Sequence, residues 1–192
     1  VADPIVTTGD VDDTAVISNI PSTAGLDTNY AISSLYAPQA QRVAEVLSAT
    51  SVRCEMRNTG TAAGTAVTFA RDTYDLPSNF DHYIPHTWWD RTNHWMLMGP
   101  QSPQFDQWQR SGITTTGPRK RWRQIGIKPT VLRLWPPPTA ASVPNALVFE
   151  FVNDGWVQHA DGAFGRRFTA DTDTTLLDDD ALILGVKWRM WQ

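Results

Sequence analysis

The sequence predicts an α+β fold in which a helical bundle, formed by the two ends of the chain, carries an inserted small antiparallel β-sheet and loop region. Three observations favour this fold. Apolar residues repeat at helical spacing between positions 37 and 56, and they alternate as in strands between positions 122 and 152. Near the end of the chain, an apolar segment from 181 to 191 follows acidic residues and carries basic residues in its last turns, as the helix dipole favours.

The 192 residues suffice for one domain or a compact two-part subunit. We expect an N-terminal arm and helical part over residues 1–66 and a β-rich insertion with many Trp and Pro residues over 67–176. A C-terminal helix over 177–192 is expected to pack back on the helical part. No internal repeat is visible, so the parts are not copies of one unit.

The first third of the chain is expected to be an arm followed by a helix. Residues 1–34 are rich in Asp, Thr, Ser and Ala and are interrupted by Pro and Gly, which is typical of an arm or a loosely packed helical start. The helix is expected over 37–56, with Pro38 in its first turn. Its helical repeat is supplied by Val43, Val46 and Leu47.

The middle of the chain is expected to hold the strands. Residues 67–70 alternate like a strand, and dense aromatic residues and prolines over 74–103 indicate irregular loops held by packing. Ser102 before Pro103 predicts the start of a helix. Three further strands are expected over 122–128, 131–135 and 146–152.

Composition argues against several classes of protein. The chain has 9 Trp and 13 Pro, which favour a rigid body with many packed contacts. Its formal net charge of -4 argues against a protein that mainly coats nucleic acid. The single cysteine, Cys54, rules out an internal disulfide framework and is expected to be a small buried apolar side chain.

No targeting or membrane segment is evident in the sequence. No run of about 18 apolar residues occurs, so we expect no contact with a membrane. The first residues lack the basic and apolar regions of a signal peptide, so the protein is expected to be made and used in the cytoplasm.

Candidate catalytic and metal motifs lack the context that their chemistry needs. Residues 171–176 resemble the D-x-D-x-T signature of phosphatases, but no buried strand precedes them, so a turn and cap before the last helix is preferred. A loose calcium site at 178–180 is an open alternative. His82 and His86 have zinc-like spacing, but Pro85 between them disfavours a helix. We expect no enzymatic activity, no cofactor and no metal.

One basic cluster surrounds Trp122 and consists of Arg119, Lys120, Arg121 and Arg123. Three interpretations are open: contact with DNA phosphates, protection of a strand edge against unwanted pairing, or a salt-bridging face toward an acidic neighbouring subunit. The many tryptophans also allow a carbohydrate-binding module in which rings stack on sugars. Core and interface packing is preferred, because only two tryptophans lie in expected strands.

Motifs in a fixed order occupy roughly residues 67 to 192. Residues 74–80, Tyr-Asp-Leu-Pro-Ser-Asn-Phe, open the series. It continues through 89–93, 97–103, 117–119, the prolines ending at Pro138, 149–151, Trp156, 170–174 and 184–189. In order and spacing this series resembles the head-to-tail adaptor (connector) proteins of tailed bacteriophages, the tail tubular protein A-like family.

The resemblance implies a structural virion protein. Such proteins form a homo-oligomeric ring, usually of twelve copies, that joins the portal to the tail and lines or seals the DNA exit channel. The implied partners are the portal protein and a tail tube, nozzle or tail-completion protein, while genomic DNA passes through without sequence-specific binding. The implied location is the head–tail junction of the virion, after assembly in the host cytoplasm. A carbohydrate-binding or tail-side binding module of a phage particle is the alternative.

Aromatic anchors and complementary charges are the candidate contacts of such a subunit. The candidates for contact with neighbouring subunits or the portal are Trp88, Trp89, Arg91, Trp95, Trp108, Arg119, Lys120, Arg121, Arg123, Asp178, Asp179 and Asp180. The tryptophans are expected to anchor the loop region, in the core or against neighbours. The basic and acidic groups are expected to face one another between subunits.

Overall fold

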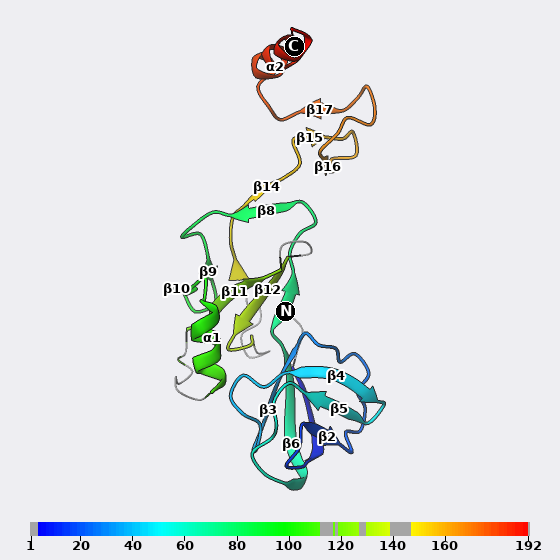
Figure 1. The fold of residues 1–192 in the computed structure, drawn as a ribbon, viewed down its shortest axis with the longest axis vertical. Helices are drawn as coiled ribbons and strands as arrows, with labels where there is room; N and C mark the ends of the chain where they lie inside the picture. The colour runs from blue at the N-terminus through cyan, green and yellow to red at the C-terminus, as the bar shows by residue number, and fades with distance from the viewer. Residues whose placement is uncertain (1–3, 112–116, 118, 127–129, 139–146, 192) are drawn as a thin grey trace. The chain divides into compact units, whose positions relative to one another are not determined.

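The computed structural model describes residues 4–111, 117, 119–126, 130–138 and 147–191 (Figure 1). In this part of the chain, regular structure consists of five antiparallel sheets and two short helices, with 40% strand. The chain divides into two compact units. Unit 1 comprises Val1–Leu76 and Trp88–Val148, and unit 2 comprises Pro77–Thr87 and Phe149–Gln192. The three-part division expected from the sequence stays a prediction.

The fold is mostly β, and the predicted helical bundle at the chain ends is wrong. In place of the helix expected over 37–56, the chain forms β4 (Val43–Ser48) and β5 (Ser51–Cys54), joined by a tight turn. Val46 and Leu47 are both exposed, so their helical spacing does not mark a buried face. The β-branched residues of this segment instead suit strand pairing.

The first 34 residues also form strands instead of a helical start. They contain β1 (Ile5–Val11), β2 (Val16–Ser18) and β3 (Tyr30–Ser34). With β6 (Ala62–Arg71), β4 and β5 these strands form one antiparallel sheet in the order β3-β6-β1-β2-β5-β4. The strand expected over 67–70 is confirmed as part of β6.

The six-stranded sheet curls until its two edges meet. Ala31 of β3 forms a bridge with Arg42, just before β4, and the Ile32 N–H donates to the Gln41 carbonyl at 2.8 Å. The side chains enclosed by the sheet are Val11, Ile17, Ile20, Leu26, Tyr30, Ile32, Val43, Val52, Cys54, Val67 and Phe69. Cys54 is buried as expected, and this burial raises the pKa of its thiol to about 12.

Two smaller sheets and one helix complete the described part of unit 1. The first sheet has the order β11-β12-β7 and contains β7 (Thr73–Asp75), β11 (Arg121–Ile125) and β12 (Val131–Trp135). The second has the order β10-β9-β13 and contains β9 (Trp89–Asp90), β10 (Trp95–Met96) and β13 (Leu147–Val148). The helix is α1 (Pro103–Arg110), and its N-cap Ser102 accepts a hydrogen bond from the Phe105 N–H at 3.2 Å. The expected strand over 131–135 and helix start at Ser102 are therefore confirmed.

Unit 2 contains two small sheets and the last helix. One sheet pairs β8 (Phe80–Tyr83) with β14 (Phe151–Asn153), and the other places β15 (Val157–Gln158) between β16 (Phe164–Gly165) and β17 (Thr174–Thr175). The helix is α2 (Asp179–Met190), as expected near the end of the chain, but it has no helical part on which to pack and none of its residues is buried. Neither helix in the described part of the chain is long and apolar enough to cross a membrane.

Candidate interaction surfaces

A stacked pair of tryptophans anchors the loop region of unit 1. Trp88 is buried and stacks on the buried Trp122 with ring centroids 4.1 Å apart and an interplanar angle of 19°. Gly99 makes room for this pair, because a Cβ there would lie 2.6 Å from the Trp122 carbonyl oxygen and 2.8 Å from its Cδ1. The structure thus places Trp88 in the core, one of the two roles expected for it.

Beside this anchor, an apolar row crosses the sheet that contains β9. Trp89 lies directly opposite Met96 on one side and Val148 on the other, so the three side chains share one face. We name these residues the Trp89 row. Trp89 is 41% exposed and Met96 is also exposed, although both are large apolar side chains. Trp and Met are enriched at protein interfaces, so the row is a candidate contact surface.

The opposite face of this sheet is held by a buried carboxylate. Asp90 accepts hydrogen bonds from the backbone N–H groups of Thr92 and Asn93 and from Lys120 Nζ at 3.0 Å. Burial opposes ionisation, but the hydrogen bonds from Asn93 and Lys120 hold the pKa of Asp90 below its ordinary value. Lys120 is therefore fixed within unit 1. Trp95 lies opposite Asp90 and is exposed, so Trp89 and Trp95 do not form one stacking platform of the kind a sugar requires.

The basic cluster is largely engaged inside unit 1. Besides Lys120, the Arg121 guanidinium lies 4.6 Å from the Phe105 ring centroid, and Arg123 contacts Asp106 at 2.8 Å. Arg119 is exposed and its guanidinium lies 6.0 Å from the centre of the Trp95 ring. β11 is the last strand of its sheet, but its outer edge is already hydrogen-bonded to Met98 and Gln101, so the arrangement does not single out protection of a strand edge. Contact with DNA or with an acidic subunit stays a prediction.

The remaining candidates of unit 1 lie on its surface. Arg91 is exposed between β9 and β10, and Trp108 is exposed on α1. The structure does not bring all of the candidates together. It collects Trp88, Trp89 and Lys120 around the sheet that contains β9, whereas Trp108 lies on a separate element.

A second exposed apolar surface is α2, in unit 2. Asp178 caps the helix, because its carboxylate accepts from the Asp180 and Ala181 N–H groups, and Asp179 and Asp180 lie exposed in the first turn. From residue 181 to 186 the helix carries no charge. Its large exposed apolar side chains are Ile183, Leu184, Val186, Trp188 and Met190. The apolar residues of α2 are not confined to one stripe, a pattern typical of a helix that other structure covers.

Asp173 lies in the turn that the sequence predicted before the last helix. Its hydrogen bonds hold a loop of unit 2, and it does not form a catalytic triad. Its buried carboxylate accepts from His159 Nδ1 at 2.9 Å and from Thr169 and Ala170. The Thr169 N–H is the largest cause that holds the pKa of Asp173 well below its ordinary value. The Thr169 hydroxyl lies on the same His159 nitrogen as Asp173, whereas a triad needs the hydroxyl on the other nitrogen.

The other candidate metal and catalytic residues are exposed. His82 contacts its neighbour Asp81 at 2.7 Å, while His86 and Asp171 lie at the surface. Within the described residues, no three His, Cys, Asp or Glu side chains converge on a position that could hold a metal ion.

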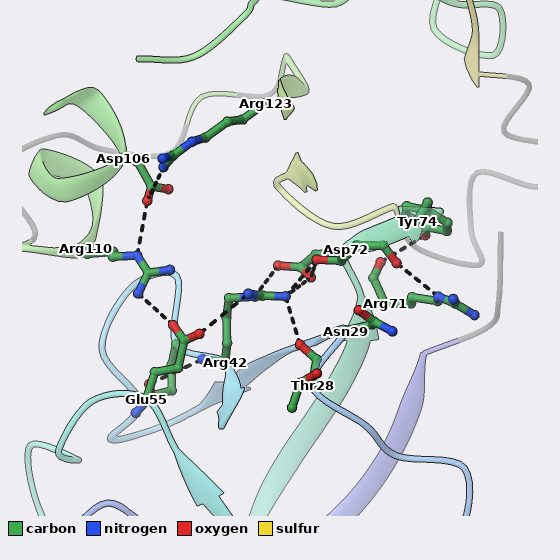
Figure 2. Close-up of polar contacts among 12 residues, drawn as sticks. Thr28, Asn29, Arg42, Glu55, Arg71, Asp72, Tyr74, Asp106, Arg110 and Arg123 are labelled. Carbon is green, nitrogen blue, oxygen red and sulfur yellow. Dashed lines mark hydrogen bonds and ion pairs between the residues drawn. The ribbon is translucent and has the colours of Figure 1, made fainter. Parts of the chain in front are cut away.

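Sequence reasoning missed a chain of buried and partly buried ion pairs in unit 1 (Figure 2). Arg42 donates to both oxygens of Asp72 at 2.8 Å and contacts Glu55 at 3.5 Å. Glu55 binds Arg110 at 2.6 Å, and Asp106 continues the chain to Arg123. Burial raises the pKa of Asp72 and the Arg42 guanidinium opposes that rise. Arg42 and Asp72 are 30 residues apart, and no local pattern marks such a pair.

Comparison with known proteins adds no relative to this picture: no family model, no curated protein and no solved structure matches the chain. The resemblance to adaptor proteins accordingly rests on the motif series in the sequence.

Proposed function

We propose that this chain is a non-enzymatic structural subunit of a tailed-phage particle, which forms the ring between the portal and the tail. The ordered motif series from residue 74 to 189 supports this proposal. The ring sits at the head–tail junction of the virion and is assembled in the host cytoplasm. Its partners are further copies of the chain, the portal protein and a tail component, and DNA passes through its channel.

The observation that carries the proposal is the exposed apolar helix α2. A helix of 12 residues is marginal in water on its own, and most helical stability in proteins comes from packing of an apolar face. Here Leu184 is 64% exposed, and the central turns have no charge to hold them in water. Exposed apolar surface is typical of interaction sites, which supports the proposal that another chain covers this helix.

The Trp89 row supplies a second contact of a different kind. It sits on a sheet whose position is fixed by the Trp88–Trp122 stack, so little side-chain entropy is lost when a partner covers it. Central Trp residues on rigid supports are the usual energetic anchors of interfaces. A ring needs two different contact surfaces on each subunit, because a head-to-tail contact closes into a ring when the rotation allows it.

The experiment is electron microscopy of the purified portal protein mixed with this chain. We expect rings stacked on the portal, which also gives the copy number. Leu184→Lys places a charge on the uncharged part of α2 and is expected to abolish the stacked rings. The matched control is Leu35→Lys, because Leu35 is 72% exposed in unit 1 and should tolerate the same change.

Two outcomes would contradict the proposal. One is a wild-type chain that stays monomeric and never joins the portal. The other is saturable glycan binding that is lost on Trp89→Ala, which would favour the carbohydrate-binding alternative. If the row anchors a subunit contact, Trp89→Ala weakens ring assembly by about 2 kcal/mol or more.

A further inference from the structure

The buried and partly buried ion pairs of unit 1 leave one arginine without a hydrogen bond or ion pair. Three carboxylates, Asp72, Glu55 and Asp106, are shared among Arg42, Arg110 and Arg123. The fourth arginine of this region is Arg133 on β12. Among the described residues its side chain forms no hydrogen bond or ion pair, and its Nε is buried without an acceptor. The cluster therefore carries four positive and three negative charges.

The strand register places Arg133 where positive charge is already present. It lies directly opposite Arg123 on one side and Thr73 on the other, so these three side chains share one face of the sheet. Like charges directly opposite one another in a sheet are destabilising. Arg123 forms an ion pair with Asp106, whereas no carboxylate of the described residues lies within ion-pair distance of Arg133. Burial is the largest cause that lowers the pKa of Arg133, and the positive charge of Arg42 adds to it, while the carboxylates of Asp72 and Glu55 act in the opposite direction.

A cavity opens beside this guanidinium. Its volume is about 390 Å³, and its lining includes Thr28, Asn29, Arg42, Thr73 and Arg133. Cavities that bind small ligands begin at about this size. The Glu55 carboxylate also lines it, but that group is already bound to Arg42 and Arg110.

We propose that this cavity binds a phosphate group, with Arg133 as its main donor and Arg42 as a second positive charge. The guanidinium of Arg133 keeps its N–H groups for a ligand, and guanidinium matches the oxygens of a phosphate in a planar, two-pronged contact. Arg42 is already hydrogen-bonded to Asp72 and Thr73, so it contributes charge rather than new donors. The site does not depend on ring formation, because every residue in it belongs to one unit of one chain.

The test is titration of the intact chain with inorganic phosphate at constant ionic strength and neutral pH. We expect a saturable rise of the melting temperature and broadening of the ³¹P resonance, neither of which chloride reproduces. Arg133→Gln is expected to weaken phosphate binding at least about tenfold, the loss typical of a charge-assisted hydrogen bond. The control is Arg57→Gln, which removes an exposed arginine and should leave binding unchanged.

The same variant separates the site from a general loss of structure. Without phosphate, Arg133→Gln is expected to melt no lower than the wild-type chain, because it removes a partly buried charge that no ion pair or hydrogen bond holds. If that variant fails to fold, Arg133→Lys keeps the charge and is expected to bind phosphate more weakly while remaining folded. Equal phosphate affinity of the wild-type chain and either folded variant would overturn the proposal, as would a response that never saturates.

The source of the phosphate is distinguished by a second ligand. A single-stranded oligonucleotide of thymidine supplies phosphodiesters without sequence information. If it competes with inorganic phosphate and its binding is lost in Arg133→Gln, the natural ligand is a nucleic-acid backbone. If inorganic phosphate binds and the oligonucleotide does not compete, the ligand is a free phosphate or a small phosphorylated molecule.

Discussion

The six-stranded sheet of unit 1 and helix α2 of unit 2 use apolar residues in opposite ways. The sheet turns Phe69, Val67 and Ile17 inward, where each is 0% exposed. The helix has a comparable apolar content, but none of its residues is buried. Buried apolar area stabilises the fold that contains it, whereas exposed apolar area stabilises only a complex that covers it. Substitutions in the two regions should therefore change different measurable quantities.

Phe69→Ala in the sheet should have the largest effect on the isolated chain. It removes a fully buried ring from the core and leaves a cavity, which costs about 4 kcal/mol of unfolding free energy. Urea unfolding followed by circular dichroism measures this loss. Val6→Ala is the control, because Val6 is on the same sheet but 72% exposed, and it should change stability by less than about 0.5 kcal/mol. Similar losses in both variants would show that β1 and β6 do not enclose a core.

Asp72→Ala should have the second-largest effect, a loss of about 3 kcal/mol of unfolding free energy. It leaves the Arg42 guanidinium buried without its two-pronged partner, and breaking a buried pair costs far more than breaking an exposed one. Asp13→Ala provides the comparison, because the Asp13–Arg57 pair is exposed on both sides and should contribute at most about 1 kcal/mol. The same unfolding experiment ranks the two variants, and equal losses would contradict the burial of the first pair.

The two regions also differ in how far the sequence could predict them. Helix α2 can be predicted from local sequence signals, because acidic residues precede an apolar segment and Lys187 and Arg189 lie in its last turn. Ser102 likewise marked the start of α1. In the sheet, the spacing of Val43, Val46 and Leu47 suggested a helix, but the segment forms a strand that pairs with β5 across a tight turn.

The candidate surfaces were predictable only in part. The tryptophans could be recognised as candidate contact residues by their type, but the burial of Trp88 and the exposure of Trp89 follow from a strand register that composition does not contain. The unpaired Arg133 could not be found at all. Its lack of a partner depends on which carboxylates Arg42 and Arg110 take, and those lie in distant parts of the chain.

The hydrogen bonds of Asp173 should make a smaller contribution to the stability of unit 2, and this contribution depends on pH. Its pKa in the folded chain is below the ordinary 3.8, so its hydrogen bonds stabilise the fold fully above about pH 4 and are lost as the pH falls further. The amide proton shifts of Thr169 and Ala170, which donate to this carboxylate, should report the loss. Asp173→Asn should remove this acid dependence, whereas Asp171→Asn, an exposed change in the same loop, should keep it. An unchanged acid response in Asp173→Asn would show that the hydrogen bonds of Asp173 do not stabilise this loop.

Leu184→Lys should have the smallest effect on the free chain. It is therefore the clearest test of the difference between the two regions. Since Leu184 contacts little within its own chain, the free energy of unfolding should stay within about 0.5 kcal/mol of the wild-type value. The measurement is urea unfolding of the free chain, carried out beside the assembly experiment with the portal. A loss of more than about 2 kcal/mol would mean that α2 packs within its own chain, and its apolar residues would then belong to a core. Unchanged stability together with lost assembly is the combination that only a docking helix produces, because a side chain that stabilises the free fold cannot be charged without cost.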